Sequence, residues 1–277
     1  MHRSTIRPAT AADREPVLEF CAHTWDDGDY IDEVYDGWLA DGGLFVGEDE
    51  TGQPIALMHL MLMPDSGAWL EGLRVAPKVR RHGWGRRMVA FGMRWAHKRG
   101  AHSLSLMTSQ SNRAMIGLIG QLGFELVLAA QWYRQNRPAT SSQTELIIAG
   151  PGSIDLESAQ LLKAHRGRYA RGWSFWKLTP ELFAGHLQRG EVVQTIDRQA
   201  WAIICPNDVD GPEIAHLEGA EGDLTLLLQG LWNLPALAQA KRVVTLTAVD
   251  TAAEQALSAA GFEPWEGMFL LYERSLR

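Results

Sequence analysis

Residues 75–88, VAPKVRRHGWGRRM, carry five Lys or Arg side chains around two glycines. An apolar strand pattern ends at Val75, and an amphipathic helical pattern begins at Trp84. A glycine loop between a strand and a helix points several unpaired backbone N–H groups at one place, where the positive end of the helix dipole also lies. Gly83 and Gly85 are expected to adopt positive φ and to let a ligand approach the backbone. The stretch therefore predicts a site for an anion, and a diphosphate suits it best.

The charge of the chain is segregated in a way that supports an anionic ligand. The net charge is −7, yet residues 72–124 hold ten Lys or Arg and no Asp or Glu. Residues 1–71 hold fifteen Asp or Glu and three Lys or Arg. A fold alone does not require such segregation, so we expect an anion beside the first part and a cation beside the second. Neither a Rossmann G-x-G-x-x-G pattern nor a P-loop Gly-Lys-Ser/Thr occurs.

The length and composition favour two domains and no membrane segment. At 277 residues the chain exceeds the usual single domain of about 100–200 residues. No apolar run approaches the roughly 20 residues of a membrane helix, and the first residues lack a signal-peptide core, so a cytoplasmic location is expected. The two cysteines, Cys21 and Cys205, argue against a disulfide scaffold or a zinc site. We expect both to be buried apolar residues and expect no metal.

Hydrophobic periodicity predicts strands and helices in alternation, with a boundary near residue 150. The polar stretch NRPATSSQTELIIAGPG, residues 136–152, ends in a Pro-Gly turn. Beyond it the pattern partly repeats, because QLGFE at 121–125 is echoed by AAGFE at 259–263. The expected strands are 5–10, 44–47, 55–63, 68–75, 103–108, 124–133, 192–196, 201–205, 213–216 and 243–248, and the expected helices are 11–22, 31–40, 84–98, 112–122 and 224–231.

These landmarks together resemble the GNAT superfamily of N-acyltransferases. The R/Q-x-x-G-x-G/A pattern of that family matches RRHGWG at 80–85, and its L-x-V-x-P strand end matches LRVAP at 73–77. Asn112 then opens a helix that Gly123 and Phe124 close. The resemblance implies an α/β (α+β) protein of two tandem GNAT-like domains, each a mixed, mostly antiparallel sheet flanked by helices.

The resemblance assigns different roles to the two domains. Residues 1–148 would be the catalytic N-acetyltransferase domain, and residues 152–277 a degenerate copy without a coenzyme A loop. In the second copy the sequence HLEGAEGDLTLL stands where the loop would be. Its three carboxylates, on Glu218, Glu221 and Asp223, would repel a diphosphate. Trp173, Phe175 and Trp176 are expected in its core or at a surface facing the first domain.

Acetyl-CoA is the cosubstrate that the resemblance implies. In the family, the strand before the loop separates from its neighbour at a bulge, and its main chain pairs with the pantetheine arm. The residues assigned to acetyl-CoA in this way are Leu73, Arg74, Val75, Arg80, Arg81, His82, Gly83, Trp84, Gly85, Arg86 and Asn112.

Direct attack of an amine on the thioester, which the resemblance implies, requires a group that takes a proton from the ammonium. Glu71 is the expected general base, because strand alternation would place it on the same face as Leu73 and Val75. His59 is an alternative base, although a histidine between apolar residues is more often a packed strand residue.

The residue that protonates the departing thiolate is left open by the sequence. Many family members have a Tyr four residues before the Gly-Phe pair, and Ile119 stands there in this chain. An aliphatic side chain cannot donate a proton. Tyr133, Tyr30 or water could serve, or the thiolate could depart unassisted.

The acceptor is expected to be a small cationic amine. The stretch TWDDGDYIDEVYDGW, residues 24–38, is strongly acidic, and Asp29 and Tyr30 within it are the expected substrate-binding residues. The acidic side chains of this patch are Asp26, Asp27, Asp29, Asp32, Glu33 and Asp36. GDYI at 28–31 and LEGLRV at 70–75 are similar to the branch with the vertebrate histidine N-acetyltransferase-like proteins. This likeness implies a free amino acid or similar amine.

Other functions stay open at this point. A non-catalytic acyl-CoA-binding or regulatory module is one, and a protein N-acetyltransferase is another. Nucleic acid is not an expected partner, because the aromatic residues among the basic ones have core spacing. Nothing in the sequence distinguishes a monomer from a homodimer.

Overall fold

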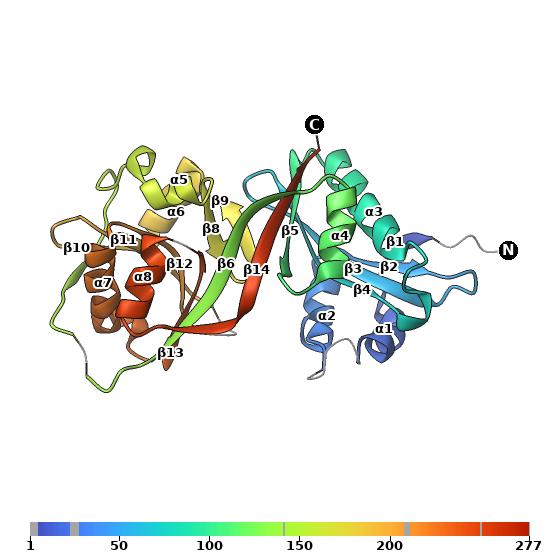
Figure 1. Ribbon diagram of the computed structural model, residues 1–277, viewed down its shortest axis with the longest axis horizontal. Helices are drawn as coiled ribbons and strands as arrows, with labels where there is room; N and C mark the ends of the chain where they lie inside the picture. Colours follow the sequence, from blue (N-terminus) through green and yellow to red (C-terminus); the bar gives the residue numbers. More distant parts are fainter. Residues whose placement is uncertain (1–4, 23–27, 141, 208–210, 250, 277) are drawn as a thin grey trace. The chain divides into compact units, whose positions relative to one another are not determined.

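The computed structural model describes residues 5–22, 28–140, 142–207, 211–249 and 251–276. Two compact units are present (Figure 1). Unit 1 comprises Met1–Leu106, Asn112–Glu125 and Tyr272–Arg277, and unit 2 comprises Met107–Ser111 and Leu126–Leu271. The units thus interleave along the chain, whereas the sequence divides into the two expected copies 1–148 and 152–277.

Unit 1 is built on a sheet in the strand order β1-β2-β3-β4-β5. Neighbours from β1 to β4 are antiparallel, and β4 and β5 are parallel. The elements of this part of the chain are β1 (Ile6–Pro8), α1 (Arg14–Cys21), α2 (Ile31–Ala40), β2 (Leu44–Glu48), β3 (Pro54–Leu62), β4 (Ala68–Val75), α3 (Trp84–Lys98), β5 (Ser103–Ser109) and α4 (Arg113–Gln121). The last residues of β14 (Glu263–Ser275) complete unit 1 beside β5.

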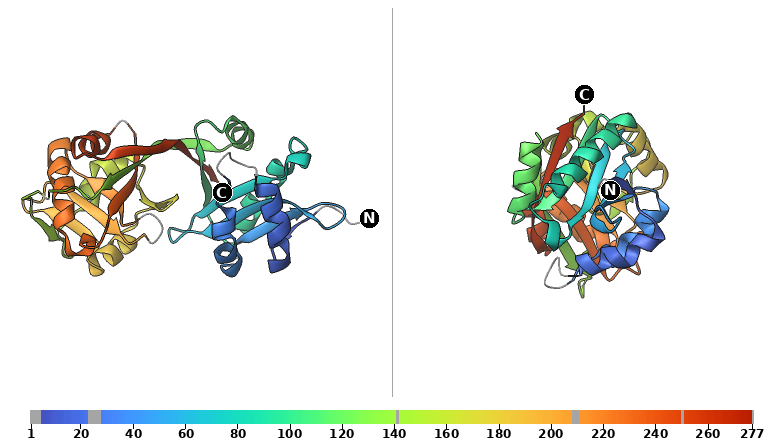
Figure 2. Two further views of the ribbon diagram at one scale, coloured as in Figure 1. Left: turned by 90° about the horizontal axis from the view of Figure 1, so that it is seen from below. Right: turned by 90° about the vertical axis from the view of Figure 1, so that its right-hand side faces the viewer.

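Two apolar cores lie on opposite faces of this sheet, and Figure 2 shows helices covering both faces. Alternate residues of β3 serve the two faces: Leu57 packs with α1 and α2, whereas Met58 packs with α3 and α4. Helix α3 comes close to the sheet because Gly92 faces Leu60 without a side chain between them. The period-2 and period-3.6 patterns of the sequence therefore place the elements correctly, and β4 and α3 have the expected bounds.

Unit 2 has the strand order β14-β6-β13-β12-β11-β10-β7, in which β12 and β13 are parallel. Its elements are β6 (Glu125–Asn136), β7 (Leu146–Ile148), α5 (Gln160–Ala164), β8 (Arg168–Arg171), β9 (Ser174–Lys177), α6 (Pro180–Gln188), β10 (Val192–Thr195), β11 (Trp201–Cys205), β12 (Glu213–Glu218), α7 (Glu221–Gly230), β13 (Arg242–Ala248) and α8 (Ala252–Ala259). Helices α7 and α8 pack on one side of its core, and α5 and α6 belong to a second core. A mixed, mostly antiparallel sheet flanked by helices in each unit confirms the expected fold class.

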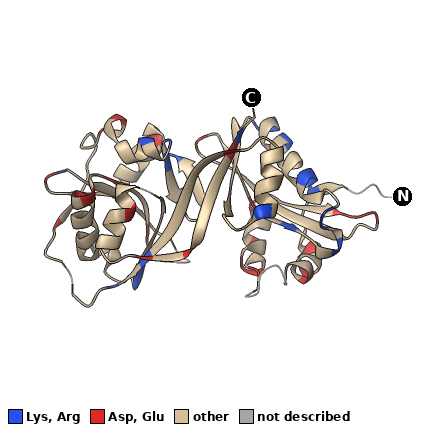
Figure 3. Ribbon diagram, in the orientation of Figure 1, with Lys and Arg blue, Asp and Glu red and all other residues tan. Residues whose placement is uncertain are grey.

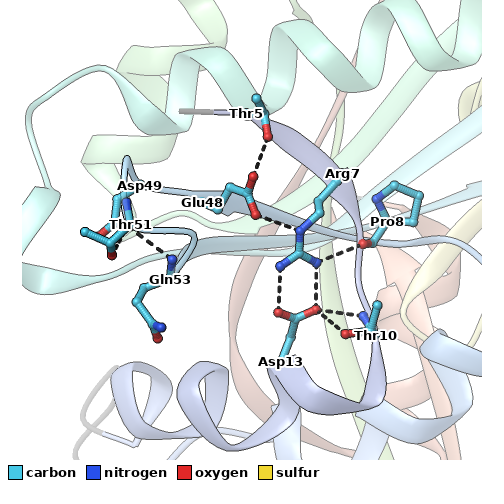
Figure 4. Close-up of polar contacts among 9 residues, drawn as sticks. All are labelled: Thr5, Arg7, Pro8, Thr10, Asp13, Glu48, Asp49, Thr51 and Gln53. Carbon is cyan, nitrogen blue, oxygen red and sulfur yellow. Dashed lines mark hydrogen bonds and ion pairs between the residues drawn. The ribbon is translucent and has the colours of Figure 1, made fainter. Parts of the chain in front are cut away.

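A polar network fastens β1 to the first helical turn (Figure 4). Arg7 forms two hydrogen bonds with Asp13, at 2.8 and 2.9 Å, and a third with Glu48 at 2.7 Å. The N–H and the hydroxyl of Thr10 also donate to Asp13, both at 2.8 Å. The hydrogen bonds from Arg7 hold the pKa of Asp13 below its usual value, although the burial of the carboxyl opposes this shift. Asp13 therefore folds as a carboxylate.

We expect Asp13→Asn to lower the free energy of unfolding by about 2 kcal/mol at neutral pH, because hydrogen bonds to a charged group are lost. A lowered pKa in the folded state stabilises the protein above the ordinary carboxyl pKa of about 4, and this stabilisation is lost as the pH falls through the folded-state value. Denaturant unfolding at pH 7 and near pH 3 measures both effects. Glu19→Gln, at an exposed position of α1, is the control. An Asn variant with the parent's acid sensitivity would contradict the assignment.

Candidate active site

The glycine loop has the geometry that the sequence predicts at one glycine and not at the other. Gly83 precedes α3 with φ of +82°, and a Cβ built there meets no atom within 4 Å. Gly85 lies in the first turn of α3 and is not among the positive-φ residues, so the expectation of positive φ there is wrong. Its role is a close contact, because a Cβ would lie 3.1 Å from Leu118. Arg81 takes the second positive φ of the loop, at +66°.

The start of α3 leaves backbone donors without helical acceptors. The first backbone bond of the helix runs from Arg87 N–H to the carbonyl of Gly83, at 3.0 Å. The N–H groups of Trp84, Gly85 and Arg86 come before it, and no side chain caps this start. Three amides and the positive end of a helix dipole thus meet beside a residue without a side chain. Such an arrangement binds phosphate-like anions.

The side chains around this helix start are mostly cationic, as Figure 3 shows along α3. Arg80, Arg81, His82 and Arg86 are exposed. Arg80 donates to the carbonyl of Val75 at 3.1 Å and Arg86 to Gln121 at 3.4 Å, so both are held near the loop. The ring of Trp84, in contrast, is buried in the core of unit 1.

Strand β4 bulges and then leaves β5. Its register with β3 runs from Ala56↔Val75 and Leu57↔Arg74 to His59↔Glu71, so β4 has one extra residue at this point. The parallel ladder between β4 and β5 consists of the pairs at Ala68 and Trp69 within the described residues. Beyond them β4 continues to Val75 with β3 alone as ladder partner. Its β5-facing edge therefore lacks ladder partners over the residues that the resemblance assigns to pantetheine.

The bulge changes which face Glu71 occupies. Leu73 and Val75 pack against the core beneath α3. Glu71 contacts His59, and Arg74 contacts Asp29, both toward α1 and α2. The expectation that Glu71, Leu73 and Val75 share one face is therefore wrong, because the extra residue of the bulge reverses the alternation after Glu71.

Glu71 lies in a close packing arrangement at the bulge. Its Oε1 lies 2.8 Å from Nδ1 of His59, and 21% of its side chain is exposed. The indole of Trp38 stacks on the imidazole of His59 with ring centroids 4.6 Å apart. Gly72, at φ of +62°, makes this possible, because a Cβ there would lie 2.5 Å from the Trp38 ring. Any larger residue at position 72 would displace Trp38 from His59.

His59 is poorly suited to be the base itself. It is 1% exposed, and its second ring nitrogen, Nε2, lies 2.9 Å from Asp41. Both nitrogens therefore face carboxylates, and neither is open to an amine. Glu71 is the more accessible of the two expected bases.

Asp29 and Tyr30, the expected substrate-binding residues, both contact Arg74. Asp29 holds the guanidinium through two hydrogen bonds, at 2.6 and 3.0 Å, and its side chain is 2% exposed. Burial opposes the charge of Arg74, but the bonds to Asp29 outweigh it and raise the pKa of Arg74. The Asp29 carboxylate is thus already neutralised by a cation of the chain. The side chain of Arg74 is likewise committed, so its main chain is the part left for a ligand.

Tyr30 remains at the surface of the same cluster. Its ring lies under the guanidinium of Arg74 at 5.1 Å and meets Trp38 edge-on at 6.2 Å. Burial of its hydroxyl end raises the pKa of Tyr30, although 44% of the residue's surface is exposed. Tyr30 therefore keeps its phenolic proton at neutral pH.

Much of the acidic patch is paired within the chain. Arg14 lies 2.5 Å from a carboxylate oxygen of Asp32 and 3.4 Å from one of Asp36. Asp26 and Asp27 lie outside the described residues. The patch is therefore a weaker cation site than the sequence alone suggests.

Three further residues from the sequence prediction have structural roles. Asn112 caps α4, where its Oδ1 accepts from the N–H of Met115 at 3.1 Å. Ile119 is fully buried in the core of unit 1. Tyr133 lies in the core of unit 2 and donates its hydroxyl proton to Glu254 at 2.6 Å. Tyr133 is thus committed to another carboxylate, which leaves Tyr30 as the better placed of the two tyrosines.

Unit 2 repeats the bulge and the splayed strands without the loop. The register of β11 and β12 shifts at Ile203/Ile204, and the parallel pairing of β12 and β13 covers Glu213 and Ile214. Only Gly219 and Ala220 connect β12 to α7. The Glu218 carboxylate accepts three backbone N–H bonds at the start of α5, at 2.6 to 2.9 Å. No glycine loop is therefore present between β12 and α7.

Trp173, Phe175 and Trp176 lie in the β8–β9 hairpin, whose strands are not among those expected from the sequence. Phe175 is buried and Trp176 packs against a core of unit 2. Trp173 is 41% exposed and contacts Trp132 and Phe269 of the same unit. The hairpin lines a small cavity of about 10 Å³ together with His165 and His216.

Both cysteines are buried, as expected. The Sγ of Cys205 lies near His186 and Glu191, whose ligand atoms are all within 4.8 Å of one another. Arg189 also points into this cluster, where it donates to Glu191 at 2.8 and 2.9 Å and lies 3.0 Å from the His186 ring. Its guanidinium supplies the positive charge that a metal ion would otherwise bring. In the described part of the chain, no helix has the length and apolar character needed to cross a membrane.

Comparison with known proteins connects this geometry to a family. The sequence model of the acetyltransferase (GNAT) family matches residues 12–124, whereas a comparison with curated protein sequences finds no match. A GCN5-related N-acetyltransferase from Sphaerobacter thermophilus has a similar structure, with TM-score 0.65 and 16% identity over 99% of this chain and 96% of that one. A tandem GNAT protein from the clavulanic acid biosynthesis pathway follows at TM-score 0.54 and 16% identity, over 99% of both chains.

A GCN5-related N-acetyltransferase from Kribbella flavida is similar at TM-score 0.52 and 15% identity, over 99% of this chain and 72% of that one. These likenesses extend over the whole chain and include a tandem arrangement, so they agree with the two GNAT-like units. Members of the family use acetyl-CoA as cosubstrate. Residues 12–124 match the acetyltransferase (GNAT) family, and this match together with the similar structures supports an acyltransferase.

Proposed function

We propose that this protein is an N-acetyltransferase that moves the acetyl group of acetyl-CoA to the primary amine of a small molecule or amino acid. Residues 1–148 supply the working site in this proposal, and residues 152–277 are a degenerate copy that binds no coenzyme A. The observation that carries the proposal is the half-buried Glu71 carboxylate at the β4 bulge, on the strand that leads directly into the glycine loop.

The loop fits the diphosphate of coenzyme A. Three backbone amides at the start of α3 would bind phosphate oxygens, and Arg80, Arg81 and Arg86 would add charge-assisted bonds. The main chain of Leu73, Arg74 and Val75 offers the edge along which a pantetheine arm can pair. The chemistry of acyl transfer is supplied by the thioester; the loop and strand hold it in place.

Glu71, which lies on the α1 and α2 side of the sheet, would act as the general base. In this role its carboxylate takes a proton from the ammonium of the acceptor, and the freed electron pair of nitrogen attacks the thioester carbonyl. Both reacting groups then meet where β4 changes face. Tyr30, which keeps its proton, is the side chain that we propose as a donor to the departing thiolate.

An amine of small size suits the side of the sheet on which Glu71 lies. Because Arg74 and Arg14 already neutralise Asp29, Asp32 and Asp36, we do not assign the acceptor's charge to any one of them. Exposed Tyr30 can contact an amine through its ring face.

A non-catalytic acyl-CoA-binding module is the second candidate. One observation favours it: Ile119, where many family members carry the Tyr acid, is fully buried and offers no proton. A protein N-acetyltransferase is a third reading of the same cosubstrate site. Mass spectrometry after incubation with acetyl-CoA and pooled amino acids and amines separates these, because only a working small-molecule enzyme yields a product heavier by one acetyl group.

Coenzyme A binding has a sharper test at Gly83. Asp tolerates the left-handed backbone that position 83 requires, so Gly83→Asp should fold. Its carboxylate would face the diphosphate, and we expect titration calorimetry to give an affinity lower by about 100-fold, from charge repulsion. Gly83→Asn has the same shape without the charge and is the matched control, with an affinity close to that of the parent. Equal affinities for all three proteins would disprove the loop as the diphosphate site.

A further inference from the structure

We propose that Asp41, His59 and Glu71 form one hydrogen-bonded chain in which His59 is the positioning residue of the base. The inference rests on the proposed function, because Glu71 acts as a base only if an amine is deprotonated there. It goes beyond that function by assigning work to two residues that contact neither cosubstrate. The inference is based on two short contacts of the buried His59 imidazole, one with Glu71 and one with Asp41.

Each of the three side chains in this hydrogen-bonded arrangement is held in place. Nδ1 of His59 lies 2.8 Å from Oε1 of Glu71, and Nε2 lies 2.9 Å from Oδ2 of Asp41. The imidazole is 1% exposed, and the stacked ring of Trp38 fixes its plane. The other oxygen of Asp41 accepts the N–H of Gly43 at 2.7 Å, which fixes the outer carboxylate as well. Such a fixed imidazole can orient a carboxylate with little loss of side-chain entropy on binding.

The chain needs two protons for its two hydrogen bonds. A neutral imidazole carries one N–H, and its other nitrogen would then face a carboxylate with two lone pairs opposed. Both contacts have hydrogen-bond length, so in the proposed arrangement the ring carries both protons and donates to each carboxylate, which leaves Glu71 able to act as a base. Asp41, whose side chain is 48% exposed, is the end of this arrangement that reaches water.

The contact with His59 selects the atom of Glu71 that reacts. Oε1 is held toward the imidazole, and Oε2 has no hydrogen bond among the described residues. Oε2 is therefore the oxygen that takes the proton: the N–H bond of the ammonium breaks, an O–H bond forms at Oε2, and the electron pair stays on nitrogen for the attack. His59 acts through Glu71 and touches no reacting atom. Residues that orient a metal ligand contribute about 10- to 100-fold to activity, and we expect His59 to contribute by a similar factor.

The test compares two substitutions of His59 in the full chain. His59→Phe keeps a ring that can stack on Trp38 but removes both hydrogen bonds, and we expect kcat to fall about 100-fold with an unchanged KM for acetyl-CoA. His59→Gln keeps an N–H for Glu71 and should recover most of that loss. Asp41→Asn, which breaks only the outer contact, should cost less than His59→Phe. Equal activity of all four proteins would overturn the proposal.

A double substitution separates positioning from general damage. If His59 acts through Glu71, then adding His59→Phe to Glu71→Gln should lower kcat no further, because the group being positioned is already gone. Losses that multiply would show that His59 merely supports the fold and would overturn the proposal. Thermal unfolding and coenzyme A titration of each variant check that fold and cosubstrate site are retained.

One measurement is independent of turnover. In the parent protein, NMR of the His59 ring should detect two hydrogen-bonded protons, one toward Glu71 and one toward Asp41, and Asp41→Asn should change the second signal only. A single hydrogen-bonded proton would overturn the chain. A parent that acetylates no amine but shows both protons would instead refute the proposed function and leave the chain in place as structure.

Discussion

Glu71→Gln is expected to lower kcat by about a thousandfold, within the range that a general base contributes. The amide has the shape of the carboxylate and can still contact His59, yet it cannot take a proton from an ammonium. Residual activity should rise with pH, because a larger fraction of the acceptor is the free amine as the pH approaches the pKa of its ammonium group. Coenzyme A affinity should not change, since the glycine loop is untouched. Coupled assays of free thiol release across pH 6–10 measure both quantities.

The matched control for this substitution is Glu125→Gln, at an exposed position at the start of β6. It makes the same chemical change away from the bulge and should retain parental kcat. If Glu71→Gln kept at least half of the parental kcat, Glu71 would not be the base. The second candidate, an acyl-CoA-binding module, predicts no amine-dependent thiol release from the parent protein at all.

Truncating the chain after Leu271 is expected to unfold unit 1 while unit 2 keeps its structure. Glu273 accepts from the hydroxyls of Ser103 and Ser105, both at 3.1 Å, and the N–H of Leu276 donates to the carbonyl of His102. Arg274 donates to the carbonyl of Leu122. The truncation removes these bonds and opens the edge of β5, a loss of about 5 kcal/mol when hydrogen bonds and apolar contacts are counted together. That is a large part of the 5–15 kcal/mol typical of a folded domain.

Hydrogen exchange measured by mass spectrometry distinguishes the two units in one experiment. Peptides from β3, β4 and β5 should lose their protection, whereas peptides from β11 and β12 serve as the internal control and should keep it. Coenzyme A binding should be lost together with the protection of β4. A truncated protein whose β3–β5 peptides remain protected would contradict the structural role of the last strand.

The sequence predicts the parts of the fold that depend on local pattern. The glycine loop, the bounds of β4 and α3, and the cap at Gly123 follow from residue type and spacing, because each is decided by a few neighbouring residues. The coarse function follows from the same landmarks. Interleaving of the units does not follow, since the ends of β14 have no local signal that says which strand they join.

The candidate site is only partly predictable for a similar reason. Strand alternation places Glu71 with Leu73, and a single extra residue at Gly72 reverses this. A glycine in a strand is a known signal for a bulge, and with it the face of Arg74 could have been anticipated. Arg74 and Asp29 are far apart in the sequence, so a count of charges cannot show that they pair. From the sequence alone, Asp29 is therefore expected to be free to bind a substrate. His59 looked like a packed residue because no pattern marks a histidine held between two carboxylates.

The short link between β12 and α7 limits what evolution or engineering can do with the second half. Eight residues separate β4 from α3, whereas two separate β12 from α7. Point substitutions could remove the acidic side chains there, but they cannot lengthen a backbone. If the second unit is a degenerate copy, as we propose, an insertion of backbone at this link would be needed before it could hold a coenzyme A diphosphate.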